Sequence, residues 1–498
     1  MTYSANESLL SRFIKGTISV GLGSASVIGF GLLNMLVAVR YLPAEDYGSF
    51  VLLTVVASFL VELSAFGLNL STPKFLADND DDDLQRRIIN TVLLMRILIM
   101  AAVIVLAVLA RSVLSDMFGS SVLLDLIEYL PPLLFLQAMT KLLRSILQGL
   151  FAFRIMGYVD LISSVSNFAL IIVLVAILKQ GIVGLVYARI IAIGLSCAFA
   201  YFAIPVQKKL EFDRAILRKL VKFGLPLQIN YILTFVFLRI DTLIIATLMG
   251  PAEIAYYEIA RKIPENLVMA YDAFRAVYYP FIARFTANGE LKRATEVINH
   301  SLRWISFFTI LGALIALLFG NEIVVLLFTE QYLPSVPAFI LLMIALNLTL
   351  VDYTLGYSLV AAGDATRPMM INVAHTTINV LANLLLLPVF GIAGAALASI
   401  TGFVATNPVY AWFLRRRELR VRVDYYLRPI AVFGVFALAT LALDPDSVIE
   451  KAAIIGLFLL ACVVFSVIVR EDVMIVFREA RAIIARYLGV WRSRRAEV

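Results

Sequence analysis

Residues 88–110 read IINTVLLMRILIMAAVIVLAVLA, an apolar run of 23 residues whose single charge is Arg96. A helix rises about 1.5 Å per residue, so a run of this length crosses a hydrocarbon layer of about 30 Å. Apolar runs of about 20–28 residues recur along the whole chain. Strands of a membrane barrel would be about half as long and would alternate polar with apolar residues, which these runs do not. The pattern therefore predicts a bundle of membrane-spanning helices.

The composition agrees with this prediction. Hydrophobic residues make up 61% of the 498 positions and charged residues 15%, whereas a soluble chain carries about 25% charged residues. Both cysteines, Cys197 and Cys462, lie in apolar runs, and the two histidines are His300 and His375. These residues argue against a disulfide scaffold and against a Cys- or His-based metal centre. Residues 1–15 lack a signal-peptide cleavage site, so we expect the first apolar run to remain as a helix.

Clusters of charged residues separate about fourteen expected spans and orient them. With a cytoplasmic N-terminus, the cytoplasmic side collects most Lys and Arg residues, Lys141 and Arg144 among them. The opposite loops hold only Arg40, Arg111, Lys179 and Lys451. We therefore predict a multi-pass protein of the cytoplasmic membrane with both termini in the cytoplasm. The predicted helices are 14–39, 47–71, 88–110, 121–147, 155–178, 182–205, 220–248, 253–282, 297–320, 334–361, 368–389, 391–414, 426–443 and 448–469.

Two halves of the chain read alike at an offset of about 207–214 residues. Each repeat holds six helices and so enters from the same face, which predicts a repeat axis along the membrane normal and a substrate site between the repeats. The matched features are the turns Pro43-Ala44-Glu45 and Pro251-Ala252-Glu253, Pro73 and Pro280, Asp160 and Asn167 with Asn372 and Asn379, and Gly181-Ile182-x-Gly184 with Gly391-Ile392-x-Gly394.

The expected architecture is an all-α integral membrane fold of two pseudo-symmetric six-helix lobes and a further helix pair. The N-terminal lobe covers 1–210, the C-terminal lobe 211–420 and the extra transmembrane pair 421–470. Apolar and basic positions segregate to different faces of 471–498, which predicts an amphipathic helix on the cytoplasmic surface. The net charge of +7 then reflects topology and anionic lipid, and no nucleic-acid partner is expected.

Ionisable residues inside predicted spans indicate a water-filled cavity, because one charge at the centre of a lone span costs about 2.5–3.5 kcal/mol. Helix 253–282 carries six such residues on one face. Arg239 and Asp241 lie near the middle of the preceding helix and, being two apart, point in different directions. The predicted substrate-binding residues of a central cavity are Arg239, Arg261, Lys262, Arg275 and Asn379. The predicted ion-coupling residues are Asp241, Glu258, Glu265, Asp272, Glu62 and Asp352.

A structural interpretation of the same charges stays open. In it, the charged face of helix 253–282 consists of ion pairs between Glu258 and Lys262, Arg261 and Glu265, and Asp272 and Arg275. Arg96, Arg189 and Arg303 lie closer to helix ends, where a long side chain reaches the interface by snorkelling. The acidic run at 80–83 is interpreted as a solvated loop, since no nucleotide-binding pattern lies near it.

Several motifs resemble those of the polysaccharide exporters, or lipid-linked oligosaccharide flippases, of the multidrug/oligosaccharidyl-lipid/polysaccharide superfamily. They are RYLPAEDYG at 40–48, FGLPL at 223–227, RIDTLII at 239–245, AAGDATR at 361–367 and FGIAGAA at 390–396. The resemblance implies two lobes arranged as a V, a central cavity, alternating access and an isoprenoid-phosphate-linked glycan as cargo. Asp241 is the one site residue whose surroundings match the family's motif.

Together these features favour a transporter over an enzyme. The expected partners are a lipid-linked glycan, membrane lipids and the machinery that polymerises or ligates glycans. No cofactor is expected, although transport could be coupled to a proton or a sodium ion by antiport. The runner-up is a multidrug or metabolite cation antiporter of the same superfamily, whose cavity should be more aromatic and acidic. A membrane glycosyltransferase or glycan polymerase is disfavoured, because its catalytic residue needs a sizeable outer loop and the outer loops here are short.

Overall fold

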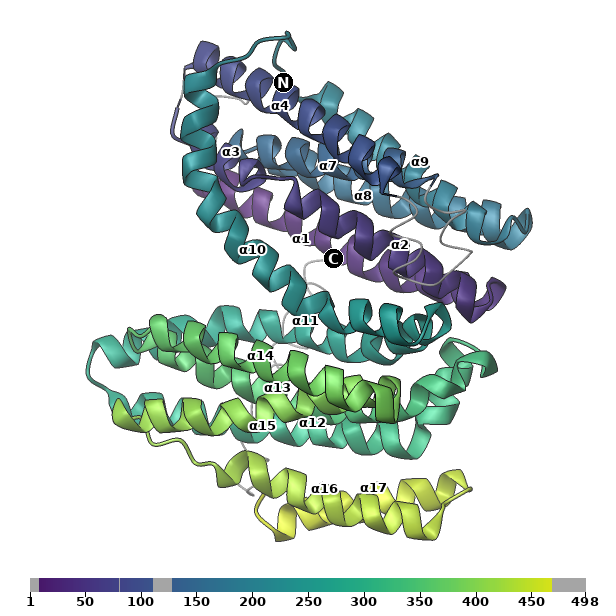
Figure 1. The fold of residues 1–498 in the computed structure, drawn as a ribbon. Helices are drawn as coiled ribbons and strands as arrows, with labels where there is room; N and C mark the ends of the chain where they lie inside the picture. The colour runs from purple at the N-terminus through teal and green to yellow at the C-terminus, as the bar shows by residue number, and fades with distance from the viewer. Residues whose placement is uncertain (1–8, 80, 111–127, 468–498) are drawn as a thin grey trace, which may run out of the picture. The chain divides into compact units, whose positions relative to one another are not determined.

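The computed structural model describes residues 9–79, 81–110 and 128–467, which form helices and no β-strand (Figure 1). The predicted all-α fold is therefore confirmed for this part of the chain. The chain divides into two compact units. The first comprises Met1–Ile259 and Val325–Pro334, and the second comprises Ala260–Val324 and Ser335–Val498. The predicted lobe boundaries at 210, 420 and 470 stay predictions, and the tail 471–498 lies outside the described residues.

The described part of the first unit is built from eight α-helices, which line up with the first seven predicted spans. Because η1 continues α8 directly, the two form one uninterrupted helical segment. These elements are α1 (Leu9–Tyr41), α2 (Ala44–Leu63), α3 (Leu68–Ala77), α4 (Asp82–Leu109), α7 (Leu130–Gly149), α8 (Phe153–Ile171) with η1 (Ile172–Ile177), α9 (Gly181–Ala203) and α10 (Arg214–Leu248).

The remaining helices belong mainly to the second unit. The first unit also holds the first nine residues of α11, the last three residues of α12, and η2 up to Pro334. The elements are α11 (Pro251–Ala287), α12 (Leu291–Leu327), η2 (Glu330–Ser335), α13 (Val336–Ala361), α14 (Thr366–Phe390), α15 (Ile392–Arg416), α16 (Asp424–Leu443) and α17 (Val448–Val464).

All fourteen predicted ranges overlap these elements, but one range was wrongly predicted as a single helix. The range 47–71, predicted as one helix, is two helices, α2 and α3. Among the described residues, nine helices are long and apolar enough to span a membrane, or ten if the bent α10 counts as one span. The number of spans, fourteen, stays a prediction.

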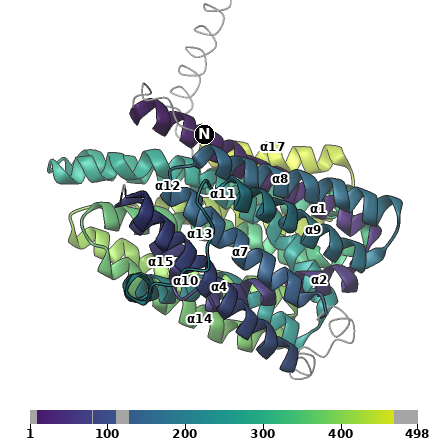
Figure 2. The same cartoon turned by 90° about the horizontal axis from the view of Figure 1, so that it is seen from above.

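The core of the first unit forms where α4, α7, α8 and α9 bring their apolar faces together. Ile89 and Val92 of α4 are buried against Leu142 and Ile146 of α7, and none of the four is more than 2% exposed. Figure 2 shows α1, α8 and α9 as neighbours, and both α1 and α9 pack on α8. This packing holds α7 in the middle of the unit, between α3, α4 and α9.

The core of the second unit forms in the same way from α11, α12, α13 and α15. Ile282 of α11, Leu302 of α12, Val351 of α13 and Leu414 of α15 belong to one cluster, and each is fully buried. The helices α16 and α17 pack on each other (Figure 1). Lys451 of α17 forms an ion pair with Glu322 of α12, which ties this pair to the unit.

In each unit one asparagine holds the segment that follows the sixth predicted helix of the repeat, and we call this arrangement the asparagine clamp. Asn90 of α4 donates to the carbonyl oxygen of Gln207 (3.2 Å) and accepts from the amide of Lys209 (3.2 Å). Asn299 of α12 donates to the carbonyl oxygen of Arg420 (3.1 Å) and accepts from the amide of Arg422 (2.8 Å). The two asparagines lie 209 residues apart, within the offset of the sequence repeat. The duplication thus extends from sequence motifs to individual hydrogen bonds.

Candidate functional site

A break between α2 and α3 begins the candidate site. The chain passes through Gly67, whose φ of 77° lies in the left-handed region, before α3 starts at Leu68. A Cβ on Gly67 would lie 2.1 Å from the carbonyl carbon of Gly224 in α10, and a Cβ on Gly224 would lie 2.3 Å from the carbonyl oxygen of Gly67. Only glycine combines this dihedral angle with so close an approach. These two glycines therefore allow α10 to pack directly on the break.

The break leaves carbonyl groups at the end of α2 without partners in a continuing helix. Arg96 of α4 donates from Nη1 to the carbonyl oxygen of Ser64 (2.6 Å) and from Nη2 to that of Val61 (3.1 Å). Gln228 of α10 donates to the carbonyl oxygen of Glu62 (2.8 Å). A guanidinium at a helix C-terminus is further favoured by the helix dipole. Broken helices are tolerated at membrane depth where protein groups satisfy the backbone in this way.

Helix α7 presents a polar stripe toward this break. Gln137, Lys141, Arg144 and Gln148 follow one another at spacings of four, three and four residues, so they share one face of the helix. Lys141 forms an ion pair with the carboxylate of Glu62 in α2. Arg144 forms an ion pair of 3.0 Å with Asp160 in α8. Since α7 is held by its neighbours on both sides, the two cations are fixed in position.

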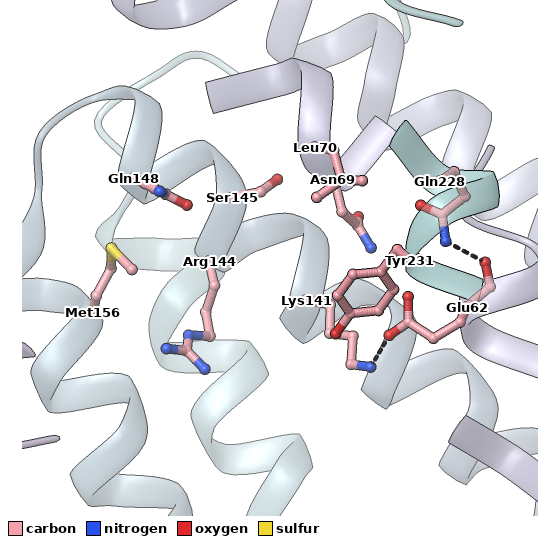
Figure 3. A pocket seen from close by; sticks show the side chains of 10 residues that line it. All are labelled: Glu62, Asn69, Leu70, Lys141, Arg144, Ser145, Gln148, Met156, Gln228 and Tyr231. Carbon is pink, nitrogen blue, oxygen red and sulfur yellow. Dashed lines mark hydrogen bonds and ion pairs between the residues drawn. The ribbon is translucent and has the colours of Figure 1, made fainter. Parts of the chain in front are cut away.

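These elements enclose a cavity of about 280 Å³ inside the first unit (Figure 3). Its volume lies just below the range of roughly 300–1,000 Å³ that is typical of ligand sites, so it has room for a small polar group. Eight of the ten lining residues have polar side chains, and the ten come from α2, α3, α7, α8 and α10. The lining residues are Glu62, Asn69, Leu70, Lys141, Arg144, Ser145, Gln148, Met156, Gln228 and Tyr231.

The cations are more exposed than the carboxylates with which they pair. The side chains of Lys141 and Arg144 are 41% and 40% exposed, whereas those of Glu62 and Asp160 are 6% and 8% exposed. Each cation is thus anchored to a buried acid and keeps an open surface on the cavity side. Figure 3 shows both cationic side chains among the lining residues, with Lys141 reaching the Glu62 carboxylate. Such a wall can bind an anion by charge-assisted hydrogen bonds.

The predicted site residues around the junction of α10 and α11 form a separate polar cluster of the first unit. Arg239 donates to Glu258 at 3.1 Å, and the hydroxyl of Thr242 donates to the same carboxylate oxygen at 3.2 Å. Asp241 accepts a hydrogen bond of 2.9 Å from the hydroxyl of Tyr257. Arg239 and Asp241 therefore have different partners, as their spacing predicted. The ion pair predicted between Glu258 and Lys262 is wrong, because Glu258 pairs with Arg239 instead.

The remaining charges of α11 belong to the second unit and pair along the helix. Arg261 and Glu265 form one ion pair, and Asp272 and Arg275 form another of 3.1 Å. Both were expected under the structural interpretation. Arg275 also donates to the hydroxyl of Tyr357 in α13 at 2.6 Å. The structure does not test whether these residues, together with Lys262, line a substrate cavity.

Asp352 and Asn379 lie buried in the second unit, at 5% and 4% exposure. The carboxylate of Asp352 in α13 accepts a hydrogen bond of 3.2 Å from Thr406 in α15. The hydroxyl of Thr406 is also 3.5 Å from Nδ1 of His375 in α14. Asn379 donates to Ser399 at 3.5 Å. Their roles in ion coupling and substrate binding stay predictions.

Sequence reasoning found Glu62 but missed the cations that surround it. Lys141 and Arg144, at the end of the predicted span 121–147, are counted there with the cytoplasmic charges, whereas in the structure they line the cavity from α7. The spacing of Gln137, Lys141, Arg144 and Gln148 is the sequence signal that could have identified them.

The snorkelling interpretation is wrong for two of the arginines. Arg96 is fully buried, with its guanidinium bound to two backbone carbonyls, so it does not reach an interface. Arg303 is 8% exposed and lies 4.1 Å from the ring centre of Tyr425, a cation–π contact that shields its charge.

Comparison with known proteins identifies the family of the chain. A family model described as polysaccharide biosynthesis protein matches residues 37–337, more than half of the chain. The chain belongs to this polysaccharide biosynthesis protein family. The matched range covers α2, α3, α4 and α7, and with them the cationic cavity.

Two relatives of this family member cover most of its length. One is an uncharacterised membrane protein of Methanocaldococcus jannaschii, 24% identical over 86% of this chain and 88% of its own. Another is the probable low-salt glycan biosynthesis flippase Agl15 of Haloferax volcanii, 21% identical over 80% of this chain and 82% of its own.

Solved structures agree on the fold. The lipid II flippase MurJ in an inward closed conformation superimposes with a TM-score of 0.67, covering 93% of this chain and all of that one at 15% identity. An inward-facing multidrug resistance transporter of the MATE family gives a TM-score of 0.65 at 16% identity, over 81% of this chain and 98% of its own. At these identities the likeness establishes a shared fold. This family member therefore has the fold of the superfamily that its sequence resembles.

Proposed function

We propose that the protein is a flippase that carries an isoprenoid-phosphate-linked oligosaccharide, or a related polysaccharide precursor, across the cytoplasmic membrane by alternating access. Membership of the polysaccharide biosynthesis family supports this function. So do relatives from Haloferax volcanii that are named as probable flippases, one of them for glycan biosynthesis. In this function the chain moves its substrate without chemical change, and it acts as a transporter rather than an enzyme.

The observation that carries the proposal is the cationic wall of the cavity in the first unit. A phosphate-linked sugar does not enter hydrocarbon unaided, because a charge there loses its hydration. Lys141 and Arg144 replace that hydration with two fixed cations, and Gln148 and Asn69 add amide donors. The isoprenoid tail needs no such site, since it remains in the lipid. A cavity of about 280 Å³ matches this division, because only the headgroup has to enter it.

The polar residues of α10, α11, α13 and α14 that the sequence singled out are part of the same proposal. Arg239, Arg261, Lys262 and Arg275, with Asn379, would hold the glycan and its phosphates on their way through the protein. Asp241, Glu258, Glu265, Asp272 and Asp352 would bind the proton or sodium ion that drives transport. A glycan polymerase or ligase on the far side of the membrane would then consume the product.

A cation antiporter for drugs or metabolites is the second candidate, since the fold is shared with a MATE-family transporter at a TM-score of 0.65. The cavity charges favour the flippase, because cationic drugs would be repelled by Lys141 and Arg144. The two functions also predict different phenotypes. Loss of a flippase changes the surface glycan, whereas loss of an antiporter changes drug sensitivity and leaves the glycan intact.

The deciding experiment is deletion of the gene followed by localisation of the lipid-linked oligosaccharide in the two leaflets. We expect the oligosaccharide to accumulate in the cytoplasmic leaflet and the surface glycan to disappear. Wild-type protein should restore export, the double variant Lys141→Met/Arg144→Met should not, and Arg293→Met, at an exposed ion pair of α12, should restore it fully. An unchanged surface glycan in the deletion strain would refute the proposal.

A further inference from the structure

The cavity holds an acid on the same wall as its two cations. Glu62 lines it together with Lys141 and Arg144, whereas Asp160, the partner of Arg144, does not. Any anion that binds between the two cations therefore approaches the Glu62 carboxylate directly. Two negative charges in one small and partly buried space repel each other, and the repulsion is relieved when one of them takes up a cation.

The surroundings of Glu62 make this repulsion strong. Its side chain is only 6% exposed, so water screens it poorly. The charged and titratable groups that face it are Arg96 from α4, Lys141 and Arg144 from α7, and Tyr231 from α10. Arg96 is already committed to two backbone carbonyls. Glu62 and an incoming anion therefore compete for the same cation, Lys141.

The charge balance of the cluster leads to the same conclusion. Three cations, Arg96, Lys141 and Arg144, and two carboxylates, Glu62 and Asp160, leave one net positive charge. A doubly charged phosphate headgroup would turn this into one net negative charge inside the protein. Uptake of one monovalent cation restores neutrality, and Glu62 is the acid in contact with the cavity. Burial of an uncompensated charge is otherwise strongly unfavourable.

We infer that Glu62 takes up one proton or one sodium ion when a phosphate headgroup binds to Lys141 and Arg144, so that anion and cation enter the first unit together. This inference rests on the proposed function for the identity of the headgroup. It also specifies the coupling, because the cation loads with the substrate and not in exchange for it. By linkage, the anion must strengthen cation binding by the same factor by which the cation strengthens anion binding.

The test is calorimetric titration of the purified full chain with inorganic pyrophosphate. Titrations in two buffers of different ionisation enthalpy measure the protons taken up, and titrations in sodium chloride and choline chloride at equal ionic strength measure sodium uptake. Pyrophosphate itself titrates, so each variant is compared with wild type at the same pH. Glu62→Gln keeps an oxygen that can accept from Lys141, and this variant is therefore expected to fold. Glu322→Gln is the matched control, since Glu322 also pairs with a lysine but lies outside the cavity.

We expect wild type and Glu322→Gln to take up about one more cation per pyrophosphate than Glu62→Gln, with tighter binding at lower pH or at higher sodium concentration. Glu62→Gln should lack that cation and should bind pyrophosphate about 5- to 150-fold more tightly. Absence of pyrophosphate binding to wild type, or uptake by Glu62→Gln equal to that of wild type, would overturn the inference. The proposed function would survive either result if the deletion strain still accumulates lipid-linked oligosaccharide in the cytoplasmic leaflet. Conversely, cation uptake with an unchanged surface glycan would leave the coupling intact and refute the function.

Discussion

The α2–α3 segment of the first unit and α11 are repeat partners, yet one is broken and the other is continuous. Pro73 of α3 corresponds to Pro280 of α11 at an offset of 207 residues. At the same offset Gly67, which forms the break, corresponds to Phe274, where α11 stays helical. A glycine with a positive φ can end a helix within one residue, whereas phenylalanine favours continuation. One position therefore decides whether the segment becomes one helix or two.

The helices that face these segments differ in charge. At an offset of 213 residues, Lys141, Arg144 and Ser145 of α7 correspond to Thr354, Tyr357 and Ser358 of α13. Lys141 binds the carboxylate of Glu62, whereas Thr354 lies 3.0 Å from the hydroxyl of Tyr271. At the offset of 207 residues Tyr271 corresponds to Ser64 and Glu62 to Met269, so the second copy has no counterpart of the ion pair between Lys141 and Glu62. Of these corresponding positions, only those of the first copy carry the cations of the cavity.

The largest effect is expected from Gly67→Ala, which challenges the break itself. The new Cβ would lie 2.1 Å from the backbone of Gly224 at a φ that disfavours alanine, so we expect a loss of at least about 3 kcal/mol or failure to fold. Gly363→Ala is the matched control, because its φ is also positive, at 85°, but nothing lies within 4 Å of the added Cβ. Thermal unfolding in detergent should show a loss of only about 1 kcal/mol there. Equal losses would mean that the contact with Gly224 is not what demands glycine.

Arg96→Met should have the next largest effect, because it removes both side-chain donors from the end of α2. The carbonyls of Val61 and Ser64 would remain buried without those donors, which is expected to cost about 2–4 kcal/mol in the free energy of unfolding. Arg96→Lys should recover part of the loss, because one ammonium cannot reproduce the two-pronged contact. A stability equal to wild type in Arg96→Met would show that the break does not depend on this arginine.

The difference in charge between α7 and its counterpart α13 should appear as a difference in transport when each is substituted. Lys141→Met should reduce export of lipid-linked oligosaccharide by about tenfold or more per folded molecule, since a hydrogen bond to a charged group contributes about 1.5–3 kcal/mol. Its counterpart Thr354→Val should change export by less than about threefold, although it removes the hydroxyl that faces Tyr271. Comparable losses in both variants would contradict the assignment of the anion site to the first unit.

The smallest effect is expected where the two copies agree. Asn90→Ala removes three hydrogen bonds, and Asn299→Ala removes two, to the segment that follows a repeat. Each variant should lower the free energy of unfolding by about 1–2 kcal/mol. Matching shifts in thermal unfolding would support a shared clamp inherited by both copies. A shift in one variant alone would restrict the clamp to that unit.

Much of the fold was predictable because apolar runs and glycine positions are local properties. Gly181 and Gly391, matched by the sequence repeat, have φ values of 62° and 60°; Gly181 is the first residue of α9, and Gly391 directly precedes α15. The break at Gly67 was missed because its surroundings are apolar, and hydrophobicity does not distinguish a continuous span from a broken one. A positive φ at this glycine becomes necessary only when Gly224, 157 residues later, packs on it.

The candidate site was only partly predictable for a related reason. Glu62 was identified as a charge inside an apolar run, but its partner Lys141 lies 79 residues away on another helix. Near the end of a predicted span, a lysine that reaches water and a lysine that lines a cavity have the same sequence signal. The polar stripe from Gln137 to Gln148 carries that information only once α7 is known to be surrounded by α3, α4 and α9.

The sequence by itself determined that this protein is a helical membrane protein, internally duplicated, with ionisable residues that lipid would not tolerate. These properties follow from the solvation of single segments, and no knowledge of neighbouring helices is needed to derive them. Only the tertiary structure decided which charges meet, because the pairing of Glu62 with Lys141 and of Arg239 with Glu258 depends on helix packing. Charges that look equivalent along the chain thereby acquire different surroundings, and the cations that line the cavity are ones that the sequence alone counted with the cytoplasmic charges at the end of a span.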